Sequence, residues 1–386
     1  MRIGIDARFL GSKQKGLGRY VQELVENLEK VVNLKGNGDL EFVIFLRKDN
    51  WKNYHPKDYR FRKVLADYKW YSLKEQIFLP FVINKEKLDL MHFPHFNVPV
   101  FYFRPFIITV HDLILKRFPT RKASTLNLLS YYFKNLAYSL VISIALKRAK
   151  KIISVSYFTK KDILKYFKIN PKKIIVIYEG VVGQPIKNNS QKNKNFLKEK
   201  YGIKKDYLLY VGNAYPHKNL ENLIDAFSKL VLIHKMDIQL VLVGQLDYFY
   251  KRLIVFSEGC PSLVAGSIIF TDYVDDSLLK VLYKNASLYV FPSLCEGFGL
   301  PPLEAMKYGT PVASSNATCL PEVLGKAAVY FNPNKSNDIT LKVKTILKDK
   351  KIKDKLRSLG LNKSEEYSWK KTAKKTLKIY KSVGIS

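Results

Sequence analysis

The stretch Glu296-Gly-Phe-Gly-Leu-Pro-Pro-Leu-Glu304 combines two glycines, two adjacent prolines and two carboxylates. Adjacent prolines suit the first turn of a helix, where a missing N–H has no intrahelical partner to lose, so the sequence predicts a helix that begins near Leu300. The positive end of that helix would face the Gly297–Gly299 loop and make a site suited to a phosphate. The two glutamates can then reach different parts of one ligand. A simple structural corner is the alternative for this stretch taken alone.

Length and composition indicate a folded protein with two domains. A chain of 386 residues is long for one core. Hydrophobic residues at 47% and aromatics at 13% exclude a wholly disordered chain despite a net charge of +33. The excess of lysine has two possible origins. It can reflect a genome rich in AT codons, or it can serve to attract the protein to an anionic membrane or to anionic substrates.

The cysteines and the N-terminus favour a reducing compartment. Cys260, Cys295 and Cys319 are odd in number and lack C-x-x-C spacing, so neither a disulfide framework nor a zinc site is indicated. The opening MRIGIDARF leaves no room for a secretory signal, and the apolar run Leu136–Leu146 is much shorter than a membrane span. We expect a cytoplasmic protein with no segment that crosses a bilayer.

Short apolar runs alternate with helical patterns along the chain, which is typical of doubly wound α/β domains with buried parallel strands. In the first half the expected strands are Arg2–Ile5, Glu41–Leu46, Leu88–Phe93, Phe106–Val110, Lys151–Val155 and Ile174–Tyr178. In the second half they are Tyr207–Val211, Ile238–Val243, Ser267–Phe270, Leu288–Phe291, Pro311–Ala313 and Val329–Phe331.

A polar stretch, Gln184–Lys198, separates the two series and reads as an exposed linker. We therefore expect a Rossmann-like domain over residues 1–183, a linker over 184–203 and a second Rossmann-like domain over 204–365. A C-terminal helix over 366–386 is expected to pack back on the first domain. The ligand is expected in a cleft between the carboxyl ends of both sheets.

Polar residues at strand ends supply the candidate chemistry. His111 and Asp112 follow a buried strand, where α/β folds place their sites, although a hydrogen-bonded core histidine is the alternative. Gly16 and Gly18 follow the first strand and precede a helix, so they can let the backbone approach a ligand, although a lone G-x-G is more often an ordinary turn. Lys218 stands in a loop where its ammonium and a helix N-terminus can face a diphosphate.

Six stretches in sequence resemble the retaining glycosyltransferases of family 4, which have the GT-B fold. They are Gly16-Leu-Gly-Arg-Tyr20, Thr109-Val-His-Asp-Leu113, Tyr210-Val-Gly-Asn-Ala-Tyr-Pro-His-Lys-Asn-Leu220, Val274-Asp-Asp-Ser-Leu278, Glu296–Glu304 and Ser315-Asn-Ala-Thr-Cys-Leu-Pro-Glu-Val323. The last is similar to the corresponding stretch of mannosyltransferase-type members. The resemblance covers nearly the whole chain, and it implies that the first domain binds acceptor and the second binds nucleotide sugar.

The resemblance also implies roles for individual residues. Glu296 would hold sugar hydroxyls, Glu304 the nucleotide ribose, and His111 would lie beside the transferred sugar. The expected catalytic residues are His111, Lys218 and Glu296. The expected donor-binding residues are Gly16, Gly18, Asn213, His217, Val274, Gly297, Phe298, Gly299, Leu300 and Glu304. Asn213 and His217 stand where many family members carry arginine, so part of the usual positive clamp is missing.

The function that the resemblance implies is metal-independent transfer of a hexose, with retention of anomeric configuration. Our best candidate is mannose from GDP-mannose, moved to a glycan or lipid-linked acceptor in cell-surface polysaccharide synthesis. No metal or cofactor is expected, and the nucleotide sugar is a substrate. The alternatives are a GT-B nucleotide-sugar epimerase and a basic nucleic-acid-binding protein, although no dedicated module with basic and aromatic residues on one face is apparent.

A group of cations in the first domain motivates one further expectation, peripheral contact with anionic membrane. The residues are Lys116, Arg117, Arg121, Lys122, Lys134, Lys147, Arg148, Lys150 and Lys151, around the apolar run Leu136–Leu146. A solvated basic face on a core helix is the alternative.

Overall fold

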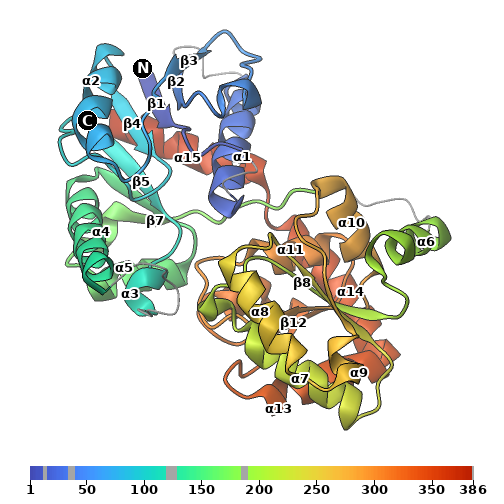
Figure 1. Cartoon of the computed structure of the whole chain (residues 1–386). Coiled ribbons are helices and arrows are strands. Elements are labelled where there is room, and N and C mark those ends of the chain that lie inside the picture. The colour runs from blue at the N-terminus through green and yellow to red at the C-terminus, as the bar shows by residue number, and fades with distance from the viewer. Residues whose placement is uncertain (12–14, 34–39, 119–127, 184–189, 385–386) are drawn as a thin grey trace. The chain divides into compact units, whose positions relative to one another are not determined.

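The computed structural model describes residues 1–11, 15–33, 40–118, 128–183 and 190–384, which form two compact units (Figure 1). The first unit comprises Met1–Lys116, most of the chain from there to Gly180, and Ser368–Ser386. The second contains Val181–Tyr367. Each unit is a parallel sheet with helices on its faces, so the predicted doubly wound α/β fold class is confirmed.

The sheet of the first unit has the strand order β3-β2-β1-β4-β5-β6-β7, and all of its pairings are parallel. The strands are β1 (Arg2–Asp6), β2 (Glu41–Leu46), β3 (Phe61–Leu65), β4 (Leu90–Phe93), β5 (Phe106–Val110), β6 (Lys151–Ser154) and β7 (Ile174–Val176). Strand β3 was not predicted from the sequence. Its FRKVL sequence carries two adjacent cations and buries only Phe61, because it is an edge strand and not a central one.

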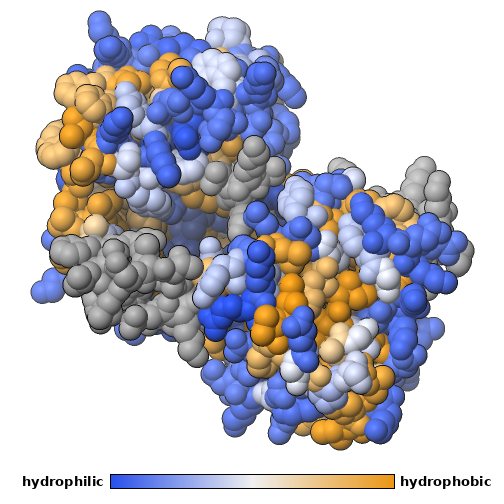
Figure 2. All heavy atoms as spheres, viewed as in Figure 1, coloured by the Kyte–Doolittle hydropathy of each residue, from blue (hydrophilic) through white to orange (hydrophobic). Residues whose placement is uncertain are grey.

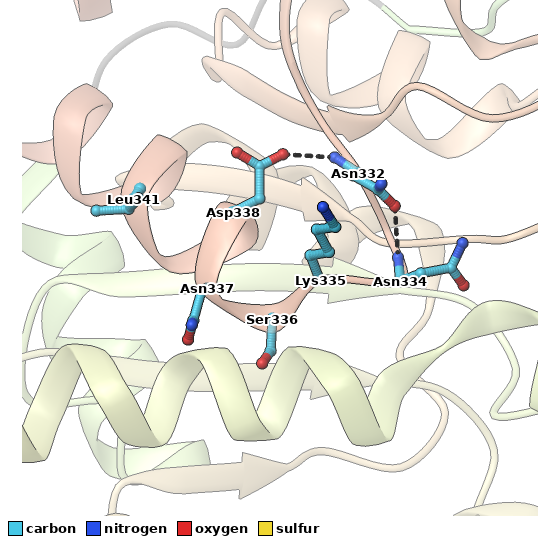
Figure 3. Close-up of a pocket in the computed structure, with 7 residues that line it drawn as sticks. All are labelled: Asn332, Asn334, Lys335, Ser336, Asn337, Asp338 and Leu341. Atoms are coloured by element: carbon cyan, nitrogen blue, oxygen red, sulfur yellow. Dashed lines mark hydrogen bonds between the residues drawn. The ribbon is translucent and has the colours of Figure 1, made fainter.

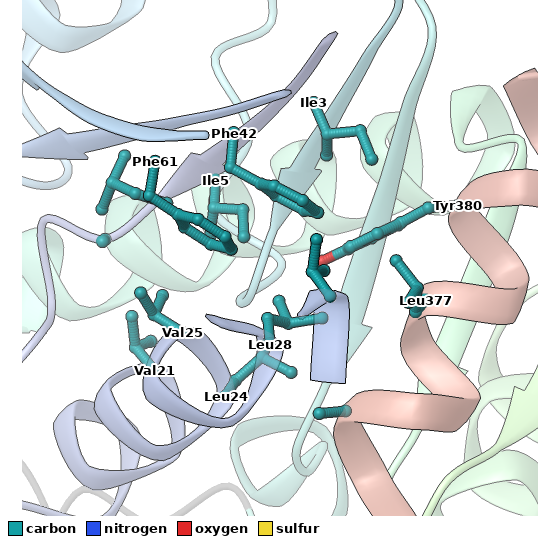
Figure 4. Packing of buried hydrophobic residues seen from close by; sticks show 14 of the residues in the cluster. Ile3, Ile5, Val21, Leu24, Val25, Leu28, Phe42, Phe61, Leu377 and Tyr380 are labelled. Carbon is teal, nitrogen blue, oxygen red and sulfur yellow. The ribbon is translucent and has the colours of Figure 1, made fainter. Parts of the chain in front are cut away.

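The helices of the first unit bury the two faces of this sheet separately. They are α1 (Lys15–Val32), α2 (Leu73–Lys85), α3 (Ile114–Arg117), α4 (Leu128–Arg148), α5 (Tyr157–Tyr166) and α15 (Trp369–Gly384). Helices α1 and α15 pack against one face, where Ile3 and Ile5 of β1 share a core with the stacked rings of Phe42 and Phe61 (Figure 4). Residues of α2, α4 and α5 form the core on the other face.

A buried chain of hydrogen bonds joins α15 to the sheet. The Tyr380 hydroxyl lies 2.6 Å from His92 Nδ1, and His92 Nε2 lies 2.9 Å from Thr109 Oγ1. The Tyr20 hydroxyl of α1 lies 3.2 Å from the same Thr109 oxygen. Burial, helped by the charge of His111, lowers the pKa of His92 to about 3, so the ring is neutral and donates through one nitrogen only. The C-terminal helix is therefore held by specific polar contacts as well as by apolar packing.

The sheet of the second unit has the order β10-β9-β8-β11-β12-β13, again with parallel pairings. Its strands are β8 (Tyr207–Val211), β9 (Gln239–Val243), β10 (Ile268–Phe270), β11 (Leu288–Phe291), β12 (Val312–Ser315) and β13 (Ala328–Phe331). Its helices are α6 (Ser190–Tyr201), α7 (Leu220–Leu232), α8 (Tyr248–Glu258), α9 (Ser262–Ala265), α10 (Asp276–Asn285), α11 (Leu300–Lys307), α12 (Leu320–Leu324), α13 (Ser336–Lys348) and α14 (Lys350–Glu365).

The stretch 184–203, which we expected to be a linker, contains a helix over most of its described part. Helix α6 contacts α10, and Leu197 is buried. The helix was not predicted because its composition is polar and few of its side chains have an apolar partner to bury against. Residues 184–189 lie outside the described chain.

We predict that Tyr380→Phe lowers the free energy of unfolding by about 1–3 kcal/mol, because it leaves a buried nitrogen of His92 without a partner. Urea denaturation measures the change. Tyr59→Phe is the matched control, since Tyr59 is 92% exposed and its hydroxyl should contribute little. Equal stability of the Tyr380→Phe and Tyr59→Phe proteins would contradict this role of the Tyr380 hydroxyl.

Candidate functional site

The candidate donor site lies in the second unit where the strand order reverses. Strands β8 and β11 are neighbours there, and their following connections lead to opposite sides of the sheet, which is where open α/β sheets bind ligands. The two loops are tied together by backbone and side-chain contacts. The amide of Leu294 donates to the carbonyl of His217 at 2.7 Å, and Asn219 Nδ2 donates to the carbonyl of Pro292 at 3.1 Å.

Two of the expected catalytic residues meet at this point. Lys218 ends the short 3-10 helix η5 (Pro216–Lys218), and its Nζ lies 2.6 Å from Glu296 Oε1 in the loop after β11. The two side chains are 14% and 10% exposed, so each buried charge needs the other as a partner. An ammonium has three donors, so Lys218 can contact a ligand oxygen while it keeps Glu296.

The loop after β12 holds both the amide and the carbonyl of Glu296 by hydrogen bonds. That loop was recognised in the sequence only by its resemblance to the family. Thr318 Oγ1 accepts from the amide of Glu296 at 3.2 Å, and Cys319 Sγ donates to its carbonyl at 3.3 Å. Burial raises the pKa of the Cys319 thiol, which keeps it a donor. Thr318 has φ +57°, a conformation uncommon for this residue type. No sequence signal marked Thr318 and Cys319 as positioning residues.

Helix α11 begins at Leu300, as the paired prolines predict. Gly299 precedes it with φ +95°, and a Cβ there would lie 2.8 Å from Leu320 Cδ2, so a side chain is excluded at this position. Pro301 and Pro302 carry no N–H, so this helix start offers fewer amide donors than an ordinary one. An anion bound here therefore depends more on the Lys218 ammonium than the glycine-rich sequence alone suggested.

The second carboxylate of the motif is buried inside α11. Glu304 is 7% exposed, and its Oε2 accepts from the Tyr283 hydroxyl of α10 at 3.1 Å. Tyr283 is a further residue that the sequence analysis did not select. Val274, also expected at the donor, is buried in the loop between β10 and α10.

Asn213 and His217 shape the loop after β8 and add no positive charge to it. Asn213 Oδ1 accepts from the amide of Tyr215 at 3.4 Å, and the Tyr210 hydroxyl donates to the Asn213 carbonyl at 2.8 Å. Burial and then the neighbouring charge of Lys218 lower the pKa of His217 to about 4, so its ring is neutral at neutral pH. The arginines expected from the family pattern therefore have no cationic replacement at these two positions.

His111 follows β5 in the first unit and uses both ring nitrogens within the protein. Nδ1 lies 3.0 Å from Glu179 Oε1 and Nε2 lies 2.9 Å from the carbonyl of Pro94, and both partners accept hydrogen bonds. Burial alone would lower the pKa of His111, but the hydrogen bond and charge of Glu179 and the Pro94 carbonyl outweigh it and raise the pKa. The geometry fits an imidazolium, and its role beside a sugar stays a prediction.

Gly16 and Gly18 lie inside the first turns of α1, not in the loop before it, which corrects the sequence-based placement. Helix α1 starts at Lys15, and the amide of Gly11 donates to the carbonyl of Gly18 at 3.4 Å. Glycine is tolerated here because the first turn of a helix depends least on intrahelical bonds. A Cβ on Gly16 would meet nothing within 4 Å. Residues 12–14 lie outside the described chain.

A separate hollow of about 600 Å³ lies at the start of α13 and contains none of the expected site residues (Figure 3). Its polar groups bond to one another: Asp338 Oδ2 accepts from the amide of Asn332 at 2.7 Å, and Asn332 Oδ1 accepts from the amide of Asn334 at 3.0 Å. These contacts hold the turn that precedes α13. In the described part of the chain, no group of three or more His, Cys, Asp or Glu side chains is placed to hold a metal ion.

Comparisons with known proteins agree with this arrangement. A family model described as "Glycosyltransferase Family 4" matches residues 15–182, and one described as "Glycosyl transferases group 1" matches residues 191–363. The fold also matches a sucrose-phosphate synthase from Thermosynechococcus elongatus, with a TM-score of 0.76, 18% identity and 99% of each chain covered. The chain belongs to the family-4 glycosyltransferases of GT-B fold.

Two relatives from Escherichia coli place it nearer to mannosyltransferases within that family. "O-antigen chain mannosyltransferase B" is 28% identical over 378 residues, which cover 95% of this chain and 96% of that protein. "Serotype-specific mannosyltransferase WbdA" is 31% identical over 269 residues, or 69% of this chain. The matched part is 32% of WbdA, so this chain spans about a third of that relative's length.

We predict that Glu179→Gln destabilises the protein more at about pH 6 than at about pH 9. Because the pKa of His111 is raised on folding, its contribution is fully present below the unfolded value of 6.5 and is lost as the pH rises through the folded value. Urea denaturation of wild type and variant at both pH values measures the difference, and groups shared by the two proteins cancel. The same destabilisation at both pH values would show that His111 is not held as a cation by Glu179.

Proposed function

We propose that this protein transfers mannose from GDP-mannose, with retention of anomeric configuration and without a metal, to a glycan or lipid-linked acceptor in cell-surface polysaccharide synthesis. The observation that carries the proposal is the Lys218–Glu296 pair, which stands at the switch point of the second sheet beside the start of α11. The mannosyltransferase relatives support the choice of sugar. No observation favours the epimerase or the nucleic-acid-binding alternative.

In the proposed transfer, the bond from the sugar's anomeric carbon to the diphosphate oxygen breaks and its electron pair passes to the diphosphate. An acceptor hydroxyl oxygen bonds to the same carbon, and its proton passes to the released diphosphate. Lys218 neutralises the charge that develops on the diphosphate in a site with little solvent, where such an interaction is strongest. Glu296 accepts from sugar hydroxyls and is kept in place by Thr318 and Cys319. Glu304 accepts from the ribose hydroxyls. We assign no covalent nucleophile, because Glu296 is assigned to the sugar hydroxyls and Glu304 to the nucleotide.

Lys218→Ala and Glu296→Gln should each lower the rate of mannosyl transfer roughly a hundredfold to a thousandfold, the usual cost of one charge-stabilising contact. Glu304→Ala should instead weaken nucleotide binding. Steady-state transfer and calorimetric titration with GDP measure the two effects. Lys229→Ala is a matched control, because Lys229 also pairs with a carboxylate, Asp225, on the exposed side of α7.

Near-normal turnover by the Lys218 or Glu296 variant would contradict the assignment of that residue. Unchanged GDP affinity after Glu304→Ala would place Glu304 outside the nucleotide site. Activity should also survive EDTA, because the proposed mechanism assigns charge neutralisation to Lys218. A strict requirement for added Mg²⁺ or Mn²⁺ would contradict that part of the proposal.

We further propose peripheral contact with anionic membrane through the first unit, where apolar side chains gather over α2 and α4 (Figure 2). We call this set the apolar face; its exposed members are Leu73, Ile77, Phe78, Phe81, Phe101, Phe103, Leu136 and Leu140. No helix in the described chain is both long and apolar enough to span a membrane. The contact would therefore be made at the surface of the bilayer.

A hydrogen bond and a ring contact link the loop that carries Phe101 and Phe103 to α2 and to the end of α4. The amide of Val100 donates to Gln76 Oε1 of α2 at 2.8 Å, and Arg148 of α4 lies 4.6 Å from the ring centre of Phe103. Arg148 is thus engaged by the protein, whereas Lys74 and Arg104 on the same surface are exposed. Arg121 and Lys122, which we expected to contribute, lie outside the described residues. Cations beside exposed aromatic rings suit an anionic lipid surface.

The double variant Phe81→Ser/Phe103→Ser should weaken binding to vesicles that contain anionic lipid by about tenfold or more, because two exposed rings lose their burial in lipid. Co-sedimentation at low and high salt measures it, and Tyr59→Ser is the control for an exposed ring elsewhere in the unit. Equal sedimentation with neutral vesicles, or no change in the double variant, would contradict membrane contact through the apolar face.

A further inference from the structure

The first unit has its own reversal of strand order, between β1 and β4, and aromatic rings gather on the loops beside it. Phe9 follows β1 and stacks on Trp70 with ring centres 4.4 Å apart, and it lies 5.5 Å from the ring of His95, which follows β4. His95 lies 3.9 Å from Phe96 and 6.5 Å from Tyr71. None of these rings is used by the proposed donor chemistry of the second unit.

A buried network of charges underlies the rings. Arg8 is 1% exposed and forms two hydrogen bonds of 2.7 Å with the carboxylate of Asp6, one from Nε and one from Nη2. Its Nη2 also donates to Glu75 Oε1 at 2.7 Å, and Asn97 Nδ2 donates to the same oxygen at 2.8 Å. Burying three charges is costly, and an apolar core of the same volume would often be more stable. Stability alone therefore does not explain why these charges are buried here.

The network fixes the loops that carry the rings. Asp6 and Arg8 stand on either side of the end of β1, just before Phe9, and Asn97 stands just after Phe96. Arg8 Nη1 donates to the carbonyl of Tyr68 at 3.2 Å, and Glu75 Oε2 accepts from the amide of Tyr71 at 2.7 Å. These contacts bind the loop before α2 to the loops after β1 and β4.

These contacts hold Tyr71 in a strained backbone conformation while its side chain stays exposed. It has φ +60°, a conformation that costs an ordinary residue about 1–2 kcal/mol, and its side chain is nevertheless 66% exposed. Large exposed rings on strained, rigidly held backbone are typical of ligand-binding sites, because the surrounding contacts maintain a conformation that packing alone does not require.

A carboxylate completes the group on the side of β5. Asp112 follows His111, and its Oδ1 accepts from the amide of Ile114 at 3.0 Å. Strand β5 pairs with β4, so Asp112 stands at the same edge of the sheet as His95, which follows β4. Burial and then the charge of Asp112 raise the pKa of Tyr138. Tyr138 of α4 also packs edge-on against Phe96 at 5.0 Å. Rings from three loops and α4, and one acidic group, thus stand at this edge of the sheet.

We propose that Tyr71, His95, Tyr138 and Asp112 form a subsite for a sugar ring of the acceptor. The electron-rich faces of aromatic rings attract the C–H face of a sugar, and a carboxylate accepts from its hydroxyls. Arg8 and Glu75 are positioning residues that hold the loops. The inference rests on the proposed transferase function and adds the chemistry by which the first unit recognises the glycan.

The test compares Tyr71→Asn and Asp112→Asn with wild type. Asparagine tolerates the φ of Tyr71, and at position 112 it keeps an acceptor for the amide of Ile114, so both variants should fold. Each should raise the KM for a mannose-containing oligosaccharide acceptor about tenfold, the value of one good ring or charged contact, and leave the KM for the donor unchanged. Tyr59→Asn, at a ring 92% exposed elsewhere in the unit, should change neither.

Binding measured without donor separates this inference from the proposed function. Saturation-transfer NMR with the same oligosaccharide should show contacts with the wild-type protein that Tyr71→Asn removes, whether or not GDP-mannose is the donor. Failure of every nucleotide sugar to support transfer would remove the proposed function, whereas the binding result would still decide the subsite. Unchanged acceptor KM and NMR contacts in both variants, or a raised donor KM instead, would overturn the inference.

Discussion

Reversal of strand order in a parallel sheet is the constraint on which both candidate sites depend. Each parallel strand needs a crossover, and crossovers of one hand place their helices on opposite faces when the order reverses. The loops after the two central strands then separate and leave backbone and side chains exposed at the carboxyl edge. In this protein the reversal falls between β1 and β4 in the first unit and between β8 and β11 in the second.

The two points at which the strand order reverses carry charged side chains with different roles. In the second unit one lysine and one glutamate neutralise each other at an edge that little solvent reaches. A lysine suits this role because its ammonium is compact and can redirect its donors when an anion arrives. In the first unit an arginine is fixed between two carboxylates, and its planar donors join the end of β1 to α2 and to the loop before α2. The lysine remains available to a ligand, whereas the arginine is committed to the fold.

Local sequence signals predicted the features that depend on local chemistry. The start of α11 at Leu300 followed from the paired prolines, and the central strands followed from continuous apolar runs. The edge strand β3 and the helix α6 were missed, because neither buries enough apolar surface to produce a periodic pattern. Gly16 and Gly18 were placed in a loop because glycine usually marks a helix boundary, but α1 begins before them.

Contacts between distant parts of the chain could not be predicted in this way. Nothing in the sequence around Thr318 and Cys319 shows that they hold the backbone of Glu296, because that depends on how two loops approach in space. The same holds for Tyr283 and Glu304, and for Tyr71, whose strain is visible only in the folded backbone. Resemblance to a family located the carboxylates and the lysine, and the structure supplied the residues that position them.

The central claim is that Lys218, Glu296 and Glu304 form a donor site for a guanosine-linked mannose. Thermal-shift measurements of the wild-type protein against GDP-mannose, UDP-glucose and other nucleotide sugars test it most directly, since a ligand that binds only the folded state raises its melting temperature. We expect GDP-mannose to give the largest increase and Lys218→Ala to reduce it. A larger increase with a uridine-linked sugar, or none with any donor, would contradict the claim.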